Sequence, residues 1–183
     1  MTGRLVLVVG PSGAGKDTLL DGARLALAGS PHFVFQQRDI TRPADAGGED
    51  HRAITMAEFV AVKAASGYAL DWQAHGLGYG VPVAIDAAIA GGQIVIVNGS
   101  RSVIDAARER YPRLAVIEVS APPAVLAMRL AARGREDQES IRKRLERSVS
   151  AAADHPDVFR VSNDGDVASG ISKLLTVLQG LTA

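Results

Sequence analysis

A glycine-rich stretch near the N-terminus constrains the fold of this chain more than any other feature. Residues 10–18 read Gly-Pro-Ser-Gly-Ala-Gly-Lys-Asp-Thr, and a continuous apolar run at residues 5–9 precedes them. The run is typical of a strand buried on both faces, and residues 17–28 have the apolar spacing of a helix. Glycines let backbone N–H groups turn around an anion, the helix N-terminus adds partial positive charge, and the lysine reaches nucleotide phosphates. The sequence therefore predicts a phosphate-binding loop.

One position of this loop departs from the usual pattern. Asp17 stands where Ser or Thr normally binds Mg²⁺ through its hydroxyl group. A carboxylate at this place would repel a polyphosphate unless a cation lies between them. We expect Asp17 to hold Mg²⁺ directly or through water, because Mg²⁺ prefers oxygen ligands. Alternatively, Asp17 faces the sugar and Thr18 makes a phosphate contact.

The remainder of the chain alternates between strand-like and helix-like segments. Apolar runs predict strands at residues 94–97, 114–119 and 158–161, and helical spacing predicts helices at 83–90, 103–110, 124–132 and 167–178. This alternation is typical of an α/β fold with a mainly parallel sheet and helices on both faces. We therefore expect the fold class of P-loop nucleotide-binding proteins.

Two segments interrupt the alternation. The first is residues 36–82, which has two short strand candidates, one at its start (33–37) and one within it (68–72). It also has a helix that begins at Thr55, whose spacing to Glu58 is that of a capping box. This segment is predicted to be an inserted subdomain. Residues 133–147 are crowded with Arg and Glu and poor in large apolar side chains, so they are predicted to project into solvent.

Composition excludes several classes of function. The chain has 183 residues, which fits one domain, and its 20 Lys and Arg balance 20 Asp and Glu. This balance argues against a nucleic-acid-binding surface, and the absence of Cys excludes a thiol nucleophile or a Cys-ligated metal. Since no stretch approaches the roughly 18 apolar residues of a membrane span, we expect a soluble, cytoplasmic protein without a membrane partner. The oligomeric state is not indicated.

Arginine is concentrated where the alternation breaks. Sixteen of the 20 basic residues are Arg. Arg38 and Arg42 lie in the inserted segment, and a second group follows at positions 129, 133, 135, 142, 144 and 147. For any single Arg, a solvated charged helix is the simpler interpretation. As a set, they suit an enzyme that holds two polyanions together.

These motifs together resemble the guanylate kinase superfamily. The resemblance rests on residues 10–18, Thr41-Arg42, Gly48-Glu49, the stretch from Leu70-Asp71-Trp72 to Tyr79-Gly80, and residues 129–135 with Arg144-Leu145. It implies a single kinase domain that has a P-loop core at about 1–32, 83–131 and 148–183. It further implies an acceptor-binding subdomain at about 33–82 and a lid at about 132–147.

Departures from the guanylate kinase pattern indicate a particular branch of this superfamily. Guanylate kinases carry Lys-Ser-Thr in the loop and a Tyr-Gly-Thr-Ser whose hydroxyls help to bind guanine, whereas this chain has Lys16-Asp17-Thr18 and Tyr79-Gly80-Val81-Pro82. Together with Asn98-Gly99-Ser100, these residues closely resemble the ribose 1,5-bisphosphate phosphokinases of phosphonate metabolism. The resemblance implies transfer of the ATP γ-phosphoryl group to ribose 1,5-bisphosphate, with Mg²⁺, giving 5-phosphoribosyl 1-diphosphate (PRPP) and ADP.

The expected site residues follow from this resemblance and from the charges. We expect Arg133, Arg135 and Arg144, with Lys16, to act on the transferring group. Acceptor phosphates are expected at Arg38, Arg42 and Tyr79, and ribose hydroxyls at Glu49 and Asp71. The ATP-binding residues are expected to be Gly10, Pro11, Ser12, Gly13, Ala14, Gly15, Lys16, Asp17 and Thr18.

Some assignments and two rival functions stay open. Trp72 and His75 could line the acceptor pocket, but a packed Trp and a loop His are the simpler interpretation. Asn98 is expected at the carboxyl end of a strand, where open α/β sheets place ligands, or as a strand cap. The rival functions are a kinase for guanylate or another phosphorylated metabolite, and a non-catalytic binding module.

Overall fold

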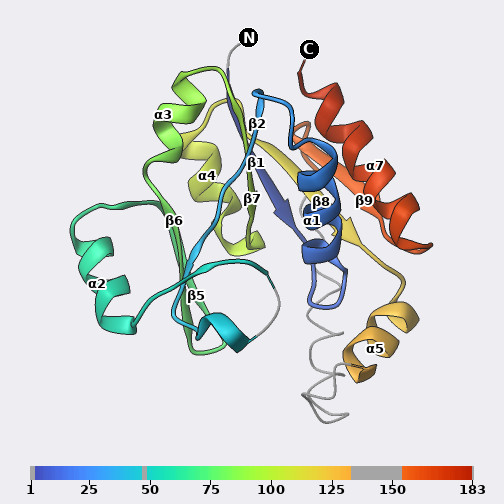
Figure 1. Cartoon of the computed structure of the whole chain (residues 1–183), viewed down its shortest axis with the longest axis horizontal. Coiled ribbons are helices and arrows are strands. Elements are labelled where there is room, and N and C mark those ends of the chain that lie inside the picture. The colour runs from blue at the N-terminus through green and yellow to red at the C-terminus, as the bar shows by residue number, and fades with distance from the viewer. Residues whose placement is uncertain (1–2, 47–48, 133–153, 183) are drawn as a thin grey trace. The chain divides into compact units, whose positions relative to one another are not determined.

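The computed structural model describes residues 3–46, 49–132 and 154–182 (Figure 1). The chain divides into two compact units, residues 1–7 with 29–115 and residues 8–28 with 116–183. Strand β1 (Arg4–Val9) contributes to both units, and its residues from Leu5 to Val9 are fully buried. This burial agrees with a strand covered on both faces, as the apolar run predicts.

The first unit contains a parallel sheet segment. Its strand order is β2-β7-β1, and β2 (Phe33–Phe35) pairs in parallel with β7 (Ile94–Asn98). Helix α3 (Ile85–Ala90) precedes β7, and a short 3-10 turn, η2 (Arg101–Val103), leads into α4 (Ile104–Arg110). The polar end of β7, Asn98, follows four buried apolar residues.

A second sheet in the first unit is built from short strands. Its order is β4-β3-β6-β5, where β3–β6 and β5–β6 are antiparallel and β3–β4 is parallel. The strands are β3 (Asp39–Ile40), β4 (Arg52–Ala53), β5 (Tyr68–Ala74) and β6 (Leu77–Pro82), with the 3-10 turn η1 (Ala44–Ala46) between β3 and β4. Helix α2 (Met56–Ala64) packs on this sheet through Phe59, which stacks on Tyr68.

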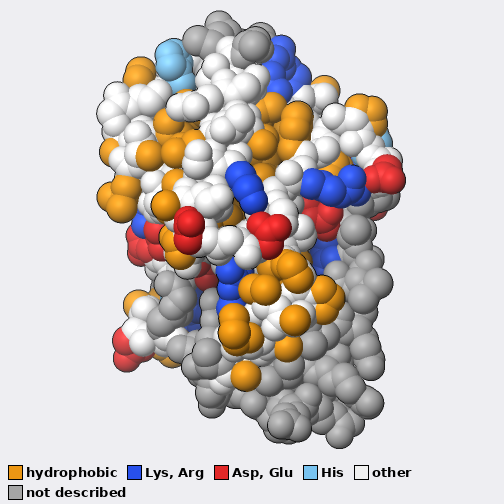
Figure 2. Space-filling view, turned by 90° about the vertical axis from the view of Figure 1, so that its right-hand side faces the viewer, with side chains coloured by type: hydrophobic (Ala, Val, Ile, Leu, Met, Phe, Trp, Pro, Cys, Tyr) orange, Lys and Arg blue, Asp and Glu red, His pale blue; other side chains and the backbone are white. Residues whose placement is uncertain are grey.

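The second unit contains the strand order β1-β8-β9. Strand β8 (Ala115–Ser120) pairs in parallel with β9 (Val158–Ser162). Helices α1 (Lys16–Ala26) and α7 (Val167–Gly180) pack together, and Gly22 permits the close approach because an added Cβ would lie 2.2 Å from Ile171. Helix α5 (Pro123–Ala132) follows β8, and its Met128 is 65% exposed. Figure 2 shows hydrophobic side chains gathered on the lower part of the face that it draws.

Most of the predicted elements are confirmed within two residues at each end. The Thr55–Glu58 capping box is also confirmed, because the Thr55 hydroxyl accepts from the Glu58 amide and the Glu58 carboxylate accepts from the Thr55 amide. The sequence did not predict β3, β4 or β6. Two of these strands have only two residues, and β6 contains two glycines and a proline, which favour turns. No helix in the described part of the chain is long and apolar enough to cross a membrane.

Candidate active site

The glycine-rich loop, residues 10–18, links β1 to α1 and has the backbone of an anion cradle. Gly10, Gly13 and Gly15 have φ angles of 146°, 86° and 87°, which L side chains rarely adopt. Gly15 is the N-cap of α1, and no side chain accepts a hydrogen bond there. The N-cap residue therefore supplies no side chain to the first turn, and the partial positive charge of this helix end suits a negatively charged group.

Two of these glycines are also required by close packing. A Cβ on Gly10 would lie 2.1 Å from the Val119 carbonyl oxygen of β8, and one on Gly15 would lie 2.4 Å from the Asn163 side-chain nitrogen. Both distances are far shorter than any real contact. The loop therefore tolerates no side chain at either position without movement of its surroundings.

Lys16 folds back over the loop. Its Nζ donates to the Gly10 carbonyl at 2.8 Å and to the Pro11 carbonyl at 3.3 Å. These contacts hold the ammonium group at the loop, next to the helix N-terminus. Asp17 follows in the first turn of α1. The first turn of α1 therefore begins with one positive and one negative residue.

Two residues that the sequence did not assign to the site hold the loop from outside. Asn163, which follows β9 and is buried, donates from Nδ2 to the Ala14 carbonyl at 2.7 Å. Arg129 of α5 lies 3.5 Å from the same oxygen. Asn163 stands in the stretch Ser-Asn-Asp-Gly, which resembles an ordinary turn, so no local signal marks its role.

The first unit holds a separate polar group, which we call the Arg38 cluster: Arg38, Glu49, Asn98, Trp72 and Tyr79. Arg38 donates from Nε and Nη2 to Glu49 Oε1, and Asn98 donates to Glu49 Oε2. The side chains of Arg38 and Glu49 are only 8% and 14% exposed. The carboxylate is thus fixed by three donors, and a carboxylate has lone pairs for about four.

Two stacked aromatic rings complete the Arg38 cluster. The Trp72 and Tyr79 rings are 5.3 Å apart and nearly parallel, and the Arg38 guanidinium lies 5.2 Å from the centre of each. Cation–π contacts of this kind stabilise the charge and fix the guanidinium plane. Trp72 is buried, as expected of a packed Trp, and its ring also contacts the Arg38 guanidinium.

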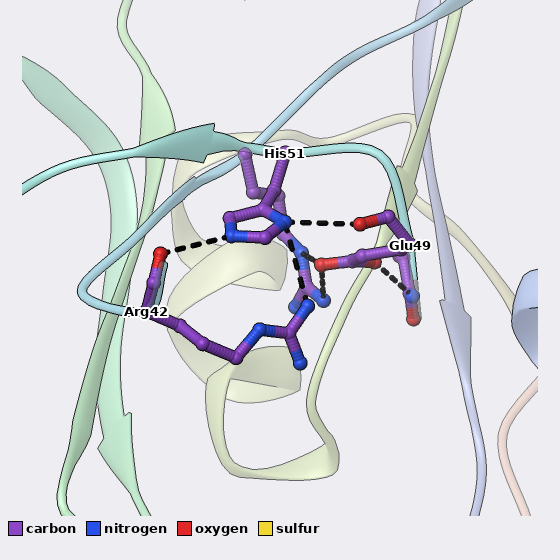
Figure 3. Close-up of polar contacts among 5 residues, drawn as sticks. Arg42, Glu49 and His51 are labelled. Carbon is purple, nitrogen blue, oxygen red and sulfur yellow. Dashed lines mark hydrogen bonds and ion pairs between the residues drawn. The ribbon is translucent and has the colours of Figure 1, made fainter. Parts of the chain in front are cut away.

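A histidine joins Arg42 to the Arg38 cluster (Figure 3). His51 Nε2 lies 3.1 Å from the Arg42 carbonyl oxygen, and Nδ1 lies 2.9 Å from the Glu49 carbonyl oxygen. Arg42 Nη2 is 3.4 Å from Nδ1, and the buried Arg42 Nε has no partner among the described residues. A buried donor without a partner is costly and suits a site that awaits an acceptor.

Other polar residues of the second sheet have partners outside the Arg38 cluster. Asp71 pairs with Lys63 of α2. Buried Asp39 accepts from Arg52 and, at 2.9 Å, from the Tyr68 hydroxyl; burial and this hydrogen bond raise the pKa of Tyr68. His75 has a φ of 53° between β5 and β6, as expected of a turn residue.

The structure therefore brings some of the predicted acceptor residues together. Arg38, Glu49 and Tyr79 are in one cluster, and Arg42 adjoins it through His51. Asp71 is not part of this group. The three lid arginines, Arg133, Arg135 and Arg144, lie outside the described residues. Their roles, the domain boundaries and the assigned site residues stay predictions.

The residues of the glycine-rich loop fit a metal that arrives with phosphate. Among the described residues, no group of three or more His, Cys, Asp or Glu could hold a metal alone. Mg²⁺ in phosphoryl transfer is commonly held by one or two carboxylates together with substrate phosphates. Asp17 supplies one carboxyl group in the first turn of α1, directly after the loop lysine.

Comparison with known proteins places the chain in a family, although no protein-family model matches the sequence. It is 47% identical over 175 residues to the ribose 1,5-bisphosphate phosphokinase PhnN of Agrobacterium fabrum, covering 96% of both chains. The enzyme of the same name from Rhodopseudomonas palustris is 48% identical and covers 97% of this chain and 89% of its own length. A bifunctional ribose 1,5-bisphosphokinase-thymidine phosphorylase of Azorhizobium caulinodans is 48% identical, but this chain spans only 26% of it.

Solved structures agree on the fold. A guanylate kinase from Anaplasma phagocytophilum has a TM-score of 0.65 at 17% identity, covering 98% of this chain and 86% of its own. A gluconokinase from Sinorhizobium meliloti has a TM-score of 0.57 at 19% identity, covering 99% and 94%. The predicted α/β fold with a mainly parallel sheet is confirmed. The chain is thus a kinase with a guanylate kinase-like fold and belongs to the ribose 1,5-bisphosphate phosphokinase family.

Proposed function

We propose that the protein transfers the γ-phosphoryl group of ATP to the 1-phosphate of ribose 1,5-bisphosphate. An oxygen of the 1-phosphate forms a bond to the γ-phosphorus while the bond from that phosphorus to the β,γ-bridging oxygen breaks. The products are 5-phosphoribosyl 1-diphosphate and ADP. The observation that carries the proposal is the 47% identity, over 96% of both chains, to a ribose 1,5-bisphosphate phosphokinase.

We assign the glycine-rich loop to ATP. Lys16 and the amides from Gly13 to Thr18 would contact its phosphates, because the ammonium and the uncapped helix end already lie together. Mg²⁺, when bound, would neutralise charge on the phosphate oxygens, and Asp17 is the protein group proposed to hold it. Asn163 and Arg129 would keep the loop in shape through the Ala14 carbonyl.

We assign the Arg38 cluster and Arg42 to the acceptor. The Glu49 carboxylate, held by Arg38 and Asn98, retains a lone pair for a ribose hydroxyl. Arg42 has a buried, unpartnered Nε that a phosphate oxygen could satisfy. Tyr79 is proposed to line the site, and Arg133, Arg135 and Arg144 are proposed to close over the transferring group. Asp71 is retained only as a candidate for a ribose hydroxyl.

The reaction needs no general base from the protein. The attacking phosphate oxygen carries negative charge at neutral pH, so it is already a nucleophile. The protein's contribution is therefore orientation and stabilisation of charge in the transition state. The residues proposed above are accordingly amides, one lysine and several arginines rather than a His or Glu base.

The product identifies the reaction. Protein, ATP, Mg²⁺ and ribose 1,5-bisphosphate are mixed, and ³¹P NMR follows the phosphorus signals. We expect a new pair of coupled diphosphate signals from the sugar product to grow in a one-to-one ratio with ADP. ADP that appears with inorganic phosphate and no sugar diphosphate would contradict the proposal. A Lys16→Ala sample serves as the control for contaminating kinases.

A further inference from the structure

His51 is buried within the acceptor segment, yet the proposed reaction gives it no task. It is 7% exposed, and its ring lies between two backbone carbonyl groups that belong to Arg42 and Glu49 (Figure 3). The first of these residues follows β3, and the second precedes β4. The ring therefore spans two points of the chain that are seven positions apart.

The geometry shows how the ring is used. A carbonyl oxygen only accepts hydrogen bonds, so a ring nitrogen must carry a hydrogen to bond it. A neutral imidazole donates to one of the two carbonyl groups at a time, and the imidazolium donates to both at once. The distances of 2.9 Å to Glu49 and 3.1 Å to Arg42 are those of ordinary hydrogen bonds, whereas the 3.4 Å from Arg42 Nη2 is at the outer limit. Both ring nitrogens face the protein backbone, so neither is directed at a substrate.

The ring holds the backbone of two residues, Arg42 and Glu49. Glu49 carries the carboxylate that receives Arg38 and Asn98. Arg42 carries the buried guanidinium nitrogen without a partner in the described part of the chain. Movement of either backbone point would shift a side chain by a similar amount, and a displacement of about 1 Å in a site can cost roughly 100-fold in rate.

We propose that His51 is a positioning residue for the acceptor: by bridging the Arg42 and Glu49 carbonyls, it sets the distance between the Arg42 guanidinium and the Glu49 carboxylate. The proposal rests on the proposed function, since it takes these two groups as acceptor ligands. It concerns the backbone bridge and not a contact between the imidazole and the substrate. Loss of the bridge should weaken acceptor binding and leave the ATP side unchanged.

The kinetic test compares three variants with a matched control. His51→Ala removes both bonds, His51→Asn can reach the Glu49 carbonyl only, and His51→Gln can reach the Arg42 carbonyl only. His32→Ala is the control, since His32 is exposed in the same unit and its side chain forms no hydrogen bond or ion pair among the described residues. We expect KM for ribose 1,5-bisphosphate to rise at least 10-fold in His51→Ala, with intermediate values for the amide variants. KM for ATP should change less than twofold.

Several outcomes would overturn the proposal. They are an unchanged acceptor KM in His51→Ala, equal losses for acceptor and ATP, or amide variants no better than Ala. If His51→Ala does not fold, the two amide variants against the wild type decide the question: an acceptor KM equal to that of the wild type in both would overturn it.

A second measurement needs no substrate and so separates this proposal from the proposed function. The Arg38 Nε–H donates to Glu49 at 3.0 Å and is buried, so its NMR signal should exchange slowly with water. We expect His51→Ala to speed that exchange at least 10-fold, and His32→Ala to leave it unchanged. Unchanged exchange in His51→Ala would refute the bridge, even if the wild type proves to use another acceptor. Faster exchange in a protein that ignores ribose 1,5-bisphosphate would instead reject the function alone.

Discussion

The glycine-rich loop of the second unit presents mainly backbone amides, whereas the Arg38 cluster of the first unit presents only side chains. In the loop, three glycines in left-handed conformations and an uncapped helix end create positive potential with a single ammonium group. In the cluster, a guanidinium and a carboxylate neutralise each other under two aromatic rings. Under the roles proposed for them, the loop would bind its ligand mainly through positive charge, and the Arg38 cluster mainly through side chains held in fixed directions.

The largest effect is expected from a substitution that removes the positive side-chain charge of the loop. Lys16→Ala should lower kcat by about 100- to 1,000-fold, as loss of one group that stabilises transition-state charge commonly does. The Arg38 cluster should be untouched, so the acceptor KM should change little. Lys173→Ala, which alters a surface lysine paired with Asp164 in the same unit, is the matched control. A large rise in the acceptor KM of Lys16→Ala would contradict the assignment of the loop to ATP and of the Arg38 cluster to the acceptor.

The next prediction tests whether Arg38 and Glu49 stabilise the fold as a coupled pair. Arg38→Met leaves the Glu49 carboxylate buried without its main partner, and we expect the free energy of unfolding to fall by about 3 kcal/mol or more. Adding Glu49→Leu should restore much of it, because an apolar pair replaces the ions. Urea unfolding of both single variants and the double variant measures the coupling. Additive losses would show that the two side chains do not depend on each other.

A smaller effect tests the backbone of the loop. Gly10→Ala places a Cβ against the Val119 carbonyl oxygen at a φ of 146°, and we expect a loss of roughly 2 kcal/mol in unfolding free energy. Gly29→Ala is the matched control, because a Cβ there meets nothing within 4 Å. Calorimetric melting of both variants gives the comparison. Equal melting temperatures would mean that the loop accommodates a side chain at Gly10.

The smallest effect concerns stability at alkaline pH and the buried Tyr68. Burial and the bond to Asp39 raise the pKa of Tyr68 in the folded state above its unfolded value of about 10. Above that pH the unfolded chain loses a proton that the folded chain retains, so stability falls with rising pH, by at most about 1.4 kcal/mol per pH unit. Below pH 10 this contribution is constant.

Tyr68→Phe should therefore make the loss of stability above pH 10 less steep. Some slope should remain, because burial and a bond to Asp86 also raise the pKa of Tyr111. Urea midpoints at several pH values between 8 and 11 measure the difference. Identical pH dependence in the variant and the wild type would mean that Tyr68 ionises equally in both states.

The sequence predicts the loop far better than the cluster, for a physical reason. A backbone cradle is encoded by glycines within nine consecutive residues, together with the strand and the helix that flank them. Glu49 is 11 positions from Arg38 and 49 from Asn98, and no local pattern relates them. Asn163 reaches the loop from 149 positions away. Such partners are set by strand pairing, which residue spacing alone does not reveal.

The same reasoning explains the elements that were missed. Strands β3 and β4 have two residues each, too few for a hydrophobic period, and they exist because β3 pairs with β6 on one side and with β4 on the other. The alternation on β5 and β6 then places Trp72 and Tyr79 opposite each other. The sequence predicted Arg38, Arg42, Glu49 and Tyr79 as candidates, but not the ion pair or the role of His51 in joining them.

The most direct test of the proposed acceptor is a competition in one vessel. Equal concentrations of ribose 1,5-bisphosphate and GMP are mixed with Mg²⁺, limiting [γ-³²P]ATP and the wild-type protein, and the labelled products are separated. We predict that nearly all the label enters 5-phosphoribosyl 1-diphosphate and that little enters GDP. Preferential labelling of GDP would contradict the account, because the site would then serve a nucleotide and not a sugar bisphosphate.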